Sequence, residues 1–88
     1  MIKQKIQLLD STPVDLTYTG LIDPHTVLSI QNIMTTGYAY LGNENVSSIT
    51  YGHKLYPGQS FIIELSPNDK LFAVGDAGVF VSVFTLEM

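Results

Sequence analysis

Short apolar segments alternate with polar turns along this 88-residue chain, and the alternation is clearest from Gly37 to Val74. Within that stretch, the segment Phe61–Leu65 is rich in β-branched and aromatic residues, which favour strands. No part of the sequence places apolar residues at i, i+3, i+4 and i+7, the spacing of an amphipathic helix. The pattern therefore predicts an all-β protein, with a single domain over residues 1–88.

Two turns in this stretch have specific sequence signatures. In Tyr56-Pro57-Gly58-Gln59, proline presets φ at the second position, and glycine accepts the positive φ that a type II turn needs at the third. Ser66-Pro67-Asn68-Asp69 fits a type I turn, with proline again in second place. Strands separated by turn signals at this spacing predict a small antiparallel β-sandwich of about seven or eight strands, of which the jelly roll is one form.

The first third of the chain predicts three further strands. Residues 2–9 alternate between apolar and polar side chains, and their two lysines suit a strand at the edge of a sheet. After a break at Asp10–Pro13, the alternation resumes in a second strand over residues 14–19. The turn signal Asp23-Pro24 precedes a third strand, expected from His25.

The last segment, residues 79–86, is apolar on both faces of the expected strand. Val79, Val81 and Val83 occupy one side, and Phe80, Phe84 and Leu86 occupy the other. A strand of this kind needs cover on both sides. Because a two-layer domain has one core, we expect a second copy of the chain to cover the valine row. The alternative is that the N-terminal strand or the 43–53 loop covers this row within one chain.

Four tyrosines gather around the long polar loop at residues 43–53. They are Tyr38, Tyr40, Tyr51 and Tyr56. Tyrosine is enriched at protein interfaces, so these residues are expected to contact a partner together with the valine row. A sugar-stacking platform is the alternative, which the absence of tryptophan weakens.

Composition narrows the class of partner. With 45% hydrophobic and 14% charged residues, the chain is too apolar to be disordered, yet no apolar run approaches the roughly 18 residues that span a bilayer. Four lysines, no arginine and eight acidic residues give a net charge of −4, whereas nucleic-acid binders carry basic patches. We therefore expect neither a nucleic-acid nor a membrane partner.

The sequence offers no pattern of catalytic or metal-binding residues. It has no cysteine, which excludes disulfides and thiolate metal sites, and His25 and His53 lack a second ligand at metal spacing. Asp69 and Asp76 are better explained as turn residues than as a catalytic pair. The serines lack the Gly-x-Ser-x-Gly context of a nucleophile elbow. We therefore expect a protein that is not an enzyme and binds no metal and no cofactor.

Motifs spread over a little under half of the chain resemble a family. They are Gln31-Asn32, Tyr40-Leu41-Gly42, Val46-Ser47, Leu55 with Pro57-Gly58-Gln59-Ser60, and Asp69-Lys70-Leu71-Phe72-Ala73-Val74. This layout resembles capsid decoration or cement proteins of tailed bacteriophages. The resemblance implies a non-enzymatic virion protein at the capsid surface, made in the host cytoplasm, which stabilises a phage head by contacts with the major capsid protein or other virion proteins. It also implies a homo-oligomer, with a trimer as the favoured order. The alternative is a phage tail, adaptor or receptor/carbohydrate-binding module.

Overall fold

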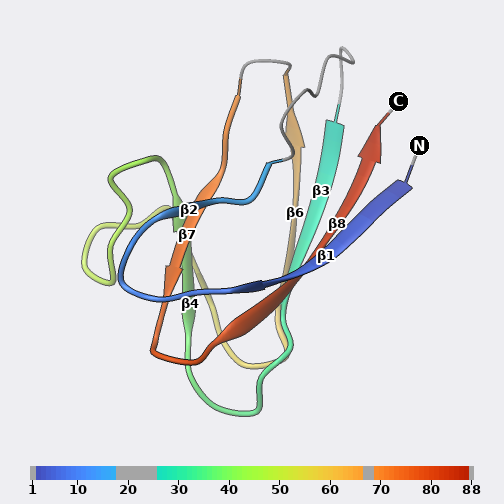
Figure 1. The fold of residues 1–88 in the computed structure, drawn as a ribbon. Helices are drawn as coiled ribbons and strands as arrows, with labels where there is room; N and C mark the ends of the chain where they lie inside the picture. Colours follow the sequence, from blue (N-terminus) through green and yellow to red (C-terminus); the bar gives the residue numbers. More distant parts are fainter. Residues whose placement is uncertain (1, 18–25, 67–68, 88) are drawn as a thin grey trace.

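The computed structural model describes residues 2–17, 26–66 and 69–87. Within these residues, eight antiparallel strands form two four-stranded sheets that pack as a sandwich (Figure 1). In chain order they are β1 (Ile2–Leu8), β2 (Val14–Asp15), β3 (Thr26–Asn32), β4 (Ala39–Gly42), β5 (His53–Leu55), β6 (Ser60–Leu65), β7 (Phe72–Gly75) and β8 (Phe80–Glu87). The predicted all-β sandwich is confirmed.

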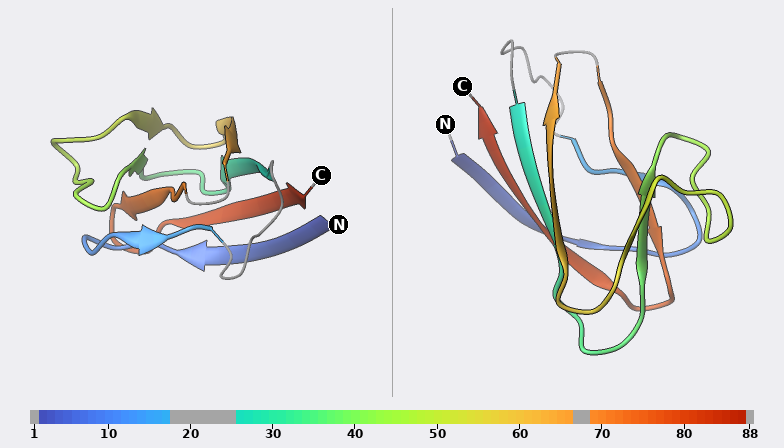
Figure 2. Two further views of the ribbon diagram at one scale, coloured as in Figure 1. Left: turned by 90° about the horizontal axis from the view of Figure 1, so that it is seen from above. Right: turned by 180° about the vertical axis from the view of Figure 1, so that it is seen from behind.

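The strand order is that of a jelly roll. Sheet A has the order β1-β8-β3-β6, and sheet B has the order β2-β7-β4-β5 (Figure 2). The first strand pairs with the last, the second with the seventh, the third with the sixth and the fourth with the fifth. This nested antiparallel pairing defines the double-sheet jelly roll. The jelly-roll form of the prediction is therefore the one that the chain adopts.

The core lies between the two sheets and is built by the period of two along each strand. Sheet A contributes Leu28, Ile30, Val81 and Val83, and sheet B contributes Ala39, Leu41, Leu55 and Ala73. All eight are buried. Each buried Val, Leu or Ile side chain stabilises the fold by roughly 1.5–3 kcal/mol relative to exposure.

The type II turn predicted at Pro57-Gly58 is confirmed. Gln59 N donates to Tyr56 O at 3.0 Å, and Gly58 has a φ of 82°. The other predicted turn is closed by Asp69 N, which donates to Ser66 O at 3.0 Å. Its central residues, Pro67 and Asn68, lie outside the described residues, so the turn type is not assigned.

A buried asparagine joins the two sheets at one end of the sandwich. The side-chain amide of Asn32, at the end of β3, donates to the backbone oxygens of Gly37 (3.1 Å) and Leu55 (3.2 Å). Its Oδ1 accepts from Met34 N at 3.1 Å. Buried polar groups of this kind are retained because their hydrogen bonds are satisfied. Asn32 thereby fixes the chain between β3 and β4 against β5.

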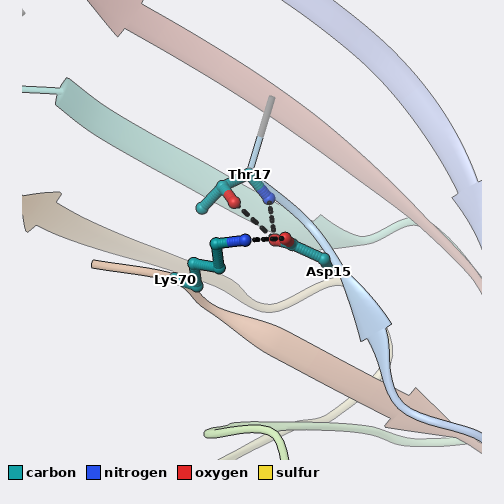
Figure 3. Close-up of polar contacts among 3 residues, drawn as sticks. All are labelled: Asp15, Thr17 and Lys70. Atoms are coloured by element: carbon teal, nitrogen blue, oxygen red, sulfur yellow. Dashed lines mark hydrogen bonds and ion pairs between the residues drawn. The ribbon is translucent and has the colours of Figure 1, made fainter. Parts of the chain in front are cut away.

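The second strand is shorter than predicted. Asp15 Oδ1 accepts from the backbone N of Thr17 at 2.8 Å and from the Thr17 hydroxyl, and Asp15 forms an ion pair with Lys70 Nζ at 3.7 Å (Figure 3). The hydrogen bond from residue i+2 to an aspartate is an Asx turn, which ends extended structure. Only Val14–Asp15 therefore pair with β7. Residues 18–25, with the predicted turn at Asp23-Pro24 and His25, lie outside the described residues.

The first strand lies at the edge of sheet A, as predicted, but most of its apolar side chains face solvent. Lys5 and Gln7 lie opposite the core valines of β8 and are half-buried, whereas Ile6 and Leu8 are exposed. Only the following residue, Leu9, is buried in the core. A lysine that points inward is a known protection of an edge strand against unwanted pairing. The outward position of Ile6 and Leu8 leaves apolar surface on sheet A.

Candidate interaction surfaces

The outer face of sheet A exposes large apolar side chains from three strands. These are Ile6 and Leu8 of β1, Phe80 and Phe84 of β8, and Ile62 of β6. They lie on one face of the sheet by register: Leu8 pairs with Phe80, and Ser29 pairs with both Phe84 and Ile62 and lies between them, since directly opposite residues share a face. Ile62 is 68% exposed and Ile6 is 58% exposed. We call these five residues the sheet A patch.

The polar residues around this patch are almost all uncharged. They are Gln4, Ser29, Gln31, Ser60 and Ser82, which occupy the same face by register. Among the side chains that the structure describes on this face, Glu64 is the only charged one. Depletion of charge together with enrichment of aromatic residues is the compositional mark of an interface core. Sheet A therefore presents a protein-binding type of surface.

The terminal strand buries the valine row, which was predicted to face a partner, and exposes the phenylalanine row. Val79, Val81 and Val83 are buried between the sheets, where β3 and sheet B cover them within one chain. The row that stays outside is that of Phe80 and Phe84, which are exposed. The valines are therefore inaccessible to a partner. Any contact of β8 with another molecule is made by its phenylalanines.

The structure brings the four predicted tyrosines together in two pairs of contacting rings. Tyr38 and Tyr56 meet edge to face with centroids 5.2 Å apart, and Tyr40 and Tyr51 lie 5.1 Å apart. Lys54, which sequence reasoning missed, places its Nζ 4.2, 5.1 and 5.7 Å from the ring centroids of Tyr38, Tyr56 and Tyr40. Lys54 lies directly opposite Tyr40 in the β4–β5 ladder, a register that the long loop hides in the sequence. These cation–π contacts stabilise the β4–β5 hairpin.

An apolar slot opens at the side of the sandwich between the edge strands β5 and β6. Its volume is about 270 Å³, and it is lined by Leu41, Gly42, Gly52, His53, Phe61, Ile63 and Leu71. Leu41 and Leu71 belong to the buried core, and Phe61 and Ile63 pack against it. The His53 ring stacks on Phe61 with centroids 4.5 Å apart. We call this opening the edge slot.

The loop between β4 and β5 has one buried and one fully presented apolar residue. Val46 is 4% exposed and packs with Tyr40 and Val74 on the outer face of sheet B. Ile49 is 89% exposed. In Figure 1 this loop extends from the sheet B side, away from the start of β1 and the end of β8, where Ile2 pairs with Leu86.

The acidic residues considered as catalytic candidates serve turns. Asp69 Oδ2 accepts from Ser66 N at 3.0 Å, and Asp76 Oδ2 accepts from Tyr38 N at 2.9 Å. In residues 2–17, 26–66 and 69–87, no group of three or more His, Cys, Asp or Glu side chains could hold a metal ion. The same residues include no helix long and apolar enough to cross a membrane.

Comparison with known proteins identifies a fold relative. No family model and no curated protein matches the sequence. Among solved structures, the chain is similar to a protein of Bacillus endospore appendages, which form a novel family of disulfide-linked pili. The TM-score is 0.60 at 10% sequence identity, and the match covers 100% of this chain and 86% of the other. At this identity, the likeness shows a shared fold.

This match overturns the resemblance to phage decoration proteins. The fold relative is a pilus protein, so the predicted virion role in head or tail, the capsid-surface location and the capsid partner are wrong. The trimer had no support apart from that resemblance. The motifs misled because they record sandwich geometry: Gly58 serves a type II turn, and Leu55 and Ala73 fill the core. Other proteins of this architecture also need glycines in their turns and apolar residues in their cores.

Proposed function

We propose that the protein is a non-enzymatic structural subunit that assembles with further copies of itself. The sheet A patch is the observation on which this proposal rests: Ile6, Phe84 and Ile62 are exposed on a face with little charge. Several large apolar side chains exposed on one face of a small protein favour an interaction site. The likeness to a pilus protein supports a structural role and a partner of the same kind.

A second copy suits this face because of its charge. The chain has a net charge of −4, so two copies repel each other where their acidic turns approach. Asp10, Asp69 and Asp76 lie in turns outside the sheet A patch. Packing two copies patch to patch therefore buries apolar surface while keeping these three carboxylates out of the contact, in which Glu64 is the only charged side chain that the structure describes.

The size of the face sets the strength of the contact. Four strands about 4.8 Å apart, with about 23 Å of length, give a projected area of roughly 440 Å². A standard interface buries about 800 Å² on each partner, so this face lies at the small end. We expect reversible association that strengthens steeply with protein concentration.

Assembly of these 88 residues cannot use disulfide bonds. The fold relative belongs to disulfide-linked pili, but this sequence contains no cysteine. Apolar burial therefore has to supply the stabilisation that a cross-link would otherwise give. Reductants are expected to leave the association unchanged.

The proposal is tested by the change Phe84→Thr, which removes apolar area and keeps a strand-favouring residue. Sedimentation equilibrium should show association of the unaltered protein that weakens at least tenfold in the variant. Tyr56→Thr is the matched control, because Tyr56 is exposed to a similar degree on the other side of the sandwich. A monomeric unaltered protein at high micromolar concentration would refute the proposal. Loss of association in Tyr56→Thr alone would move the contact to the tyrosines.

A further inference from the structure

We infer a second contact between copies, in which Ile49 at the tip of the 43–52 loop of one copy enters the edge slot of the next. The inference extends the proposed self-assembly, but it concerns a different surface. The sheet A patch lies on the outer face of one sheet, whereas Ile49 and the slot lie at the β4–β5 hairpin and the open side of the sandwich. Each contact is therefore testable without the other.

Ile49 is held in place by hydrogen bonds around the loop tip. Ser47 Oγ accepts from Ile49 N at 3.2 Å and from Thr50 N at 2.9 Å, and Ser47 N donates to Thr50 O at 2.8 Å. At the base of the loop, Gly52 N donates to Leu41 O at 2.7 Å. The side chain is thus presented by an ordered turn, which lowers the entropic cost of binding.

The edge slot has the size and chemistry to receive this side chain. Its volume of about 270 Å³ is ample for the four side-chain carbons of isoleucine. Its floor is formed by the core residues Leu41 and Leu71, and Phe61 lines it beneath His53. The lining of the slot is mostly apolar, so an aliphatic group that displaces loosely held water from it gains affinity.

For Ile49 to occupy an edge slot, it has to come from another copy of the chain. Within its own chain Ile49 is 89% exposed, so it does not fill the slot at the base of its own hairpin. A protruding apolar side chain and a complementary pocket at the β4–β5 hairpin make a contact outside the sheet A patch. Patch-to-patch packing of sheet A is isologous and closes at two copies. The combination of both contacts yields an extended assembly.

The absence of cysteine allows this contact to be trapped directly. One sample of the full chain carries Ile49→Cys, and a second, distinguishable by a mass tag, carries Gly52→Cys at the slot. A Cβ on Gly52 is accommodated, because its nearest neighbour is Leu41 O at 3.4 Å. The two are mixed with a mild thiol oxidant, and the mixed disulfide is quantified by mass spectrometry. Thr35→Cys replaces Ile49→Cys in the control, since Thr35 is also exposed but lies between β3 and β4, outside the sheet A patch and the 43–52 loop.

We expect the Ile49→Cys mixture to cross-link at least five times faster than the Thr35→Cys control. Equal rates would overturn the inference. A second measurement uses Ile49→Ser, which should reduce the assembly to pairs by weakening the second contact about ten- to hundredfold. Assemblies of unchanged size would also overturn it. If Phe84→Thr leaves association intact while Ile49→Ser abolishes it, the sheet A proposal fails and the slot contact stands.

Discussion

The outer faces of the two sheets differ in how the chain itself covers them. On sheet B, Tyr40 and Val74 are buried beneath Val46 of the 43–52 loop, and the tyrosines close around Lys54. On sheet A, Ile62 and Phe84 are exposed. In the sequence, the strands of both sheets carry apolar residues at outward-facing positions. The difference shows that apolar residues on an outer face stay available to a partner only where no loop of the same chain covers them.

The largest expected effect on stability distinguishes the buried face of β8 from its outer face. Val81→Asp places a charge among buried aliphatic groups, which should cost more than about 4 kcal/mol. A chain of 88 residues has roughly 4–13 kcal/mol of unfolding free energy, so the variant loses about a third of it or more, and urea denaturation followed by circular dichroism should show a large fall in the midpoint or an unfolded chain. Ser82→Asp, one residue along on the outer face, is the control and should keep its midpoint. A Val81→Asp midpoint equal to that of Ser82→Asp would contradict the assignment of faces.

A smaller effect should measure the loop cover of sheet B. Val46→Ala removes two methyl groups packed on Tyr40 and Val74, and should lower the unfolding free energy by about 1–3 kcal/mol. In the same loop, Ile49→Ala should change it by less than about 0.5 kcal/mol, because the side chain is exposed. Urea denaturation of both variants gives the comparison. Equal midpoints would mean that the loop does not cover the sheet.

The smallest effect concerns the lysine among the tyrosines. Lys54→Gln removes the cation–π contacts and should lower the unfolding free energy by about 0.5–1 kcal/mol. Lys70→Gln is the matched control, since its ion pair with Asp15 is largely exposed and such pairs contribute little. Thermal melts at two salt concentrations distinguish them. A larger loss in Lys70→Gln would show that the tyrosines do not hold Lys54.

Much of the fold was predictable from local sequence. The turn at Pro57-Gly58 and the strands at the centre and end of the chain follow from residue types that serve one backbone conformation. The face of each strand was harder to predict. In residues 79–86 both rows are apolar, and nothing within that segment says that sheet B will cover the valines.

The candidate surfaces depended on contacts between distant segments. The sheet A patch requires that Leu8 lie beside Phe80, and the edge slot requires that Phe61 come under His53. No spacing along the chain reveals either pair. The tyrosines were found because they are concentrated around one loop, but Lys54 became visible only with the register of β4 and β5.

The nested pairing of the strands has a consequence for when a copy becomes ready to assemble. In sheet A, β8 lies between β1 and β3, and Ile2 ends opposite Leu86. Pairing of such distant segments closes long loops and is slow. Until β8 docks, Phe80 and Phe84 are not beside Ile6 and Leu8, and the sheet A patch does not exist. The surface that we expect to recruit a neighbour is thus present only in chains whose first and last strands have paired, and chains in which β8 has not docked lack it.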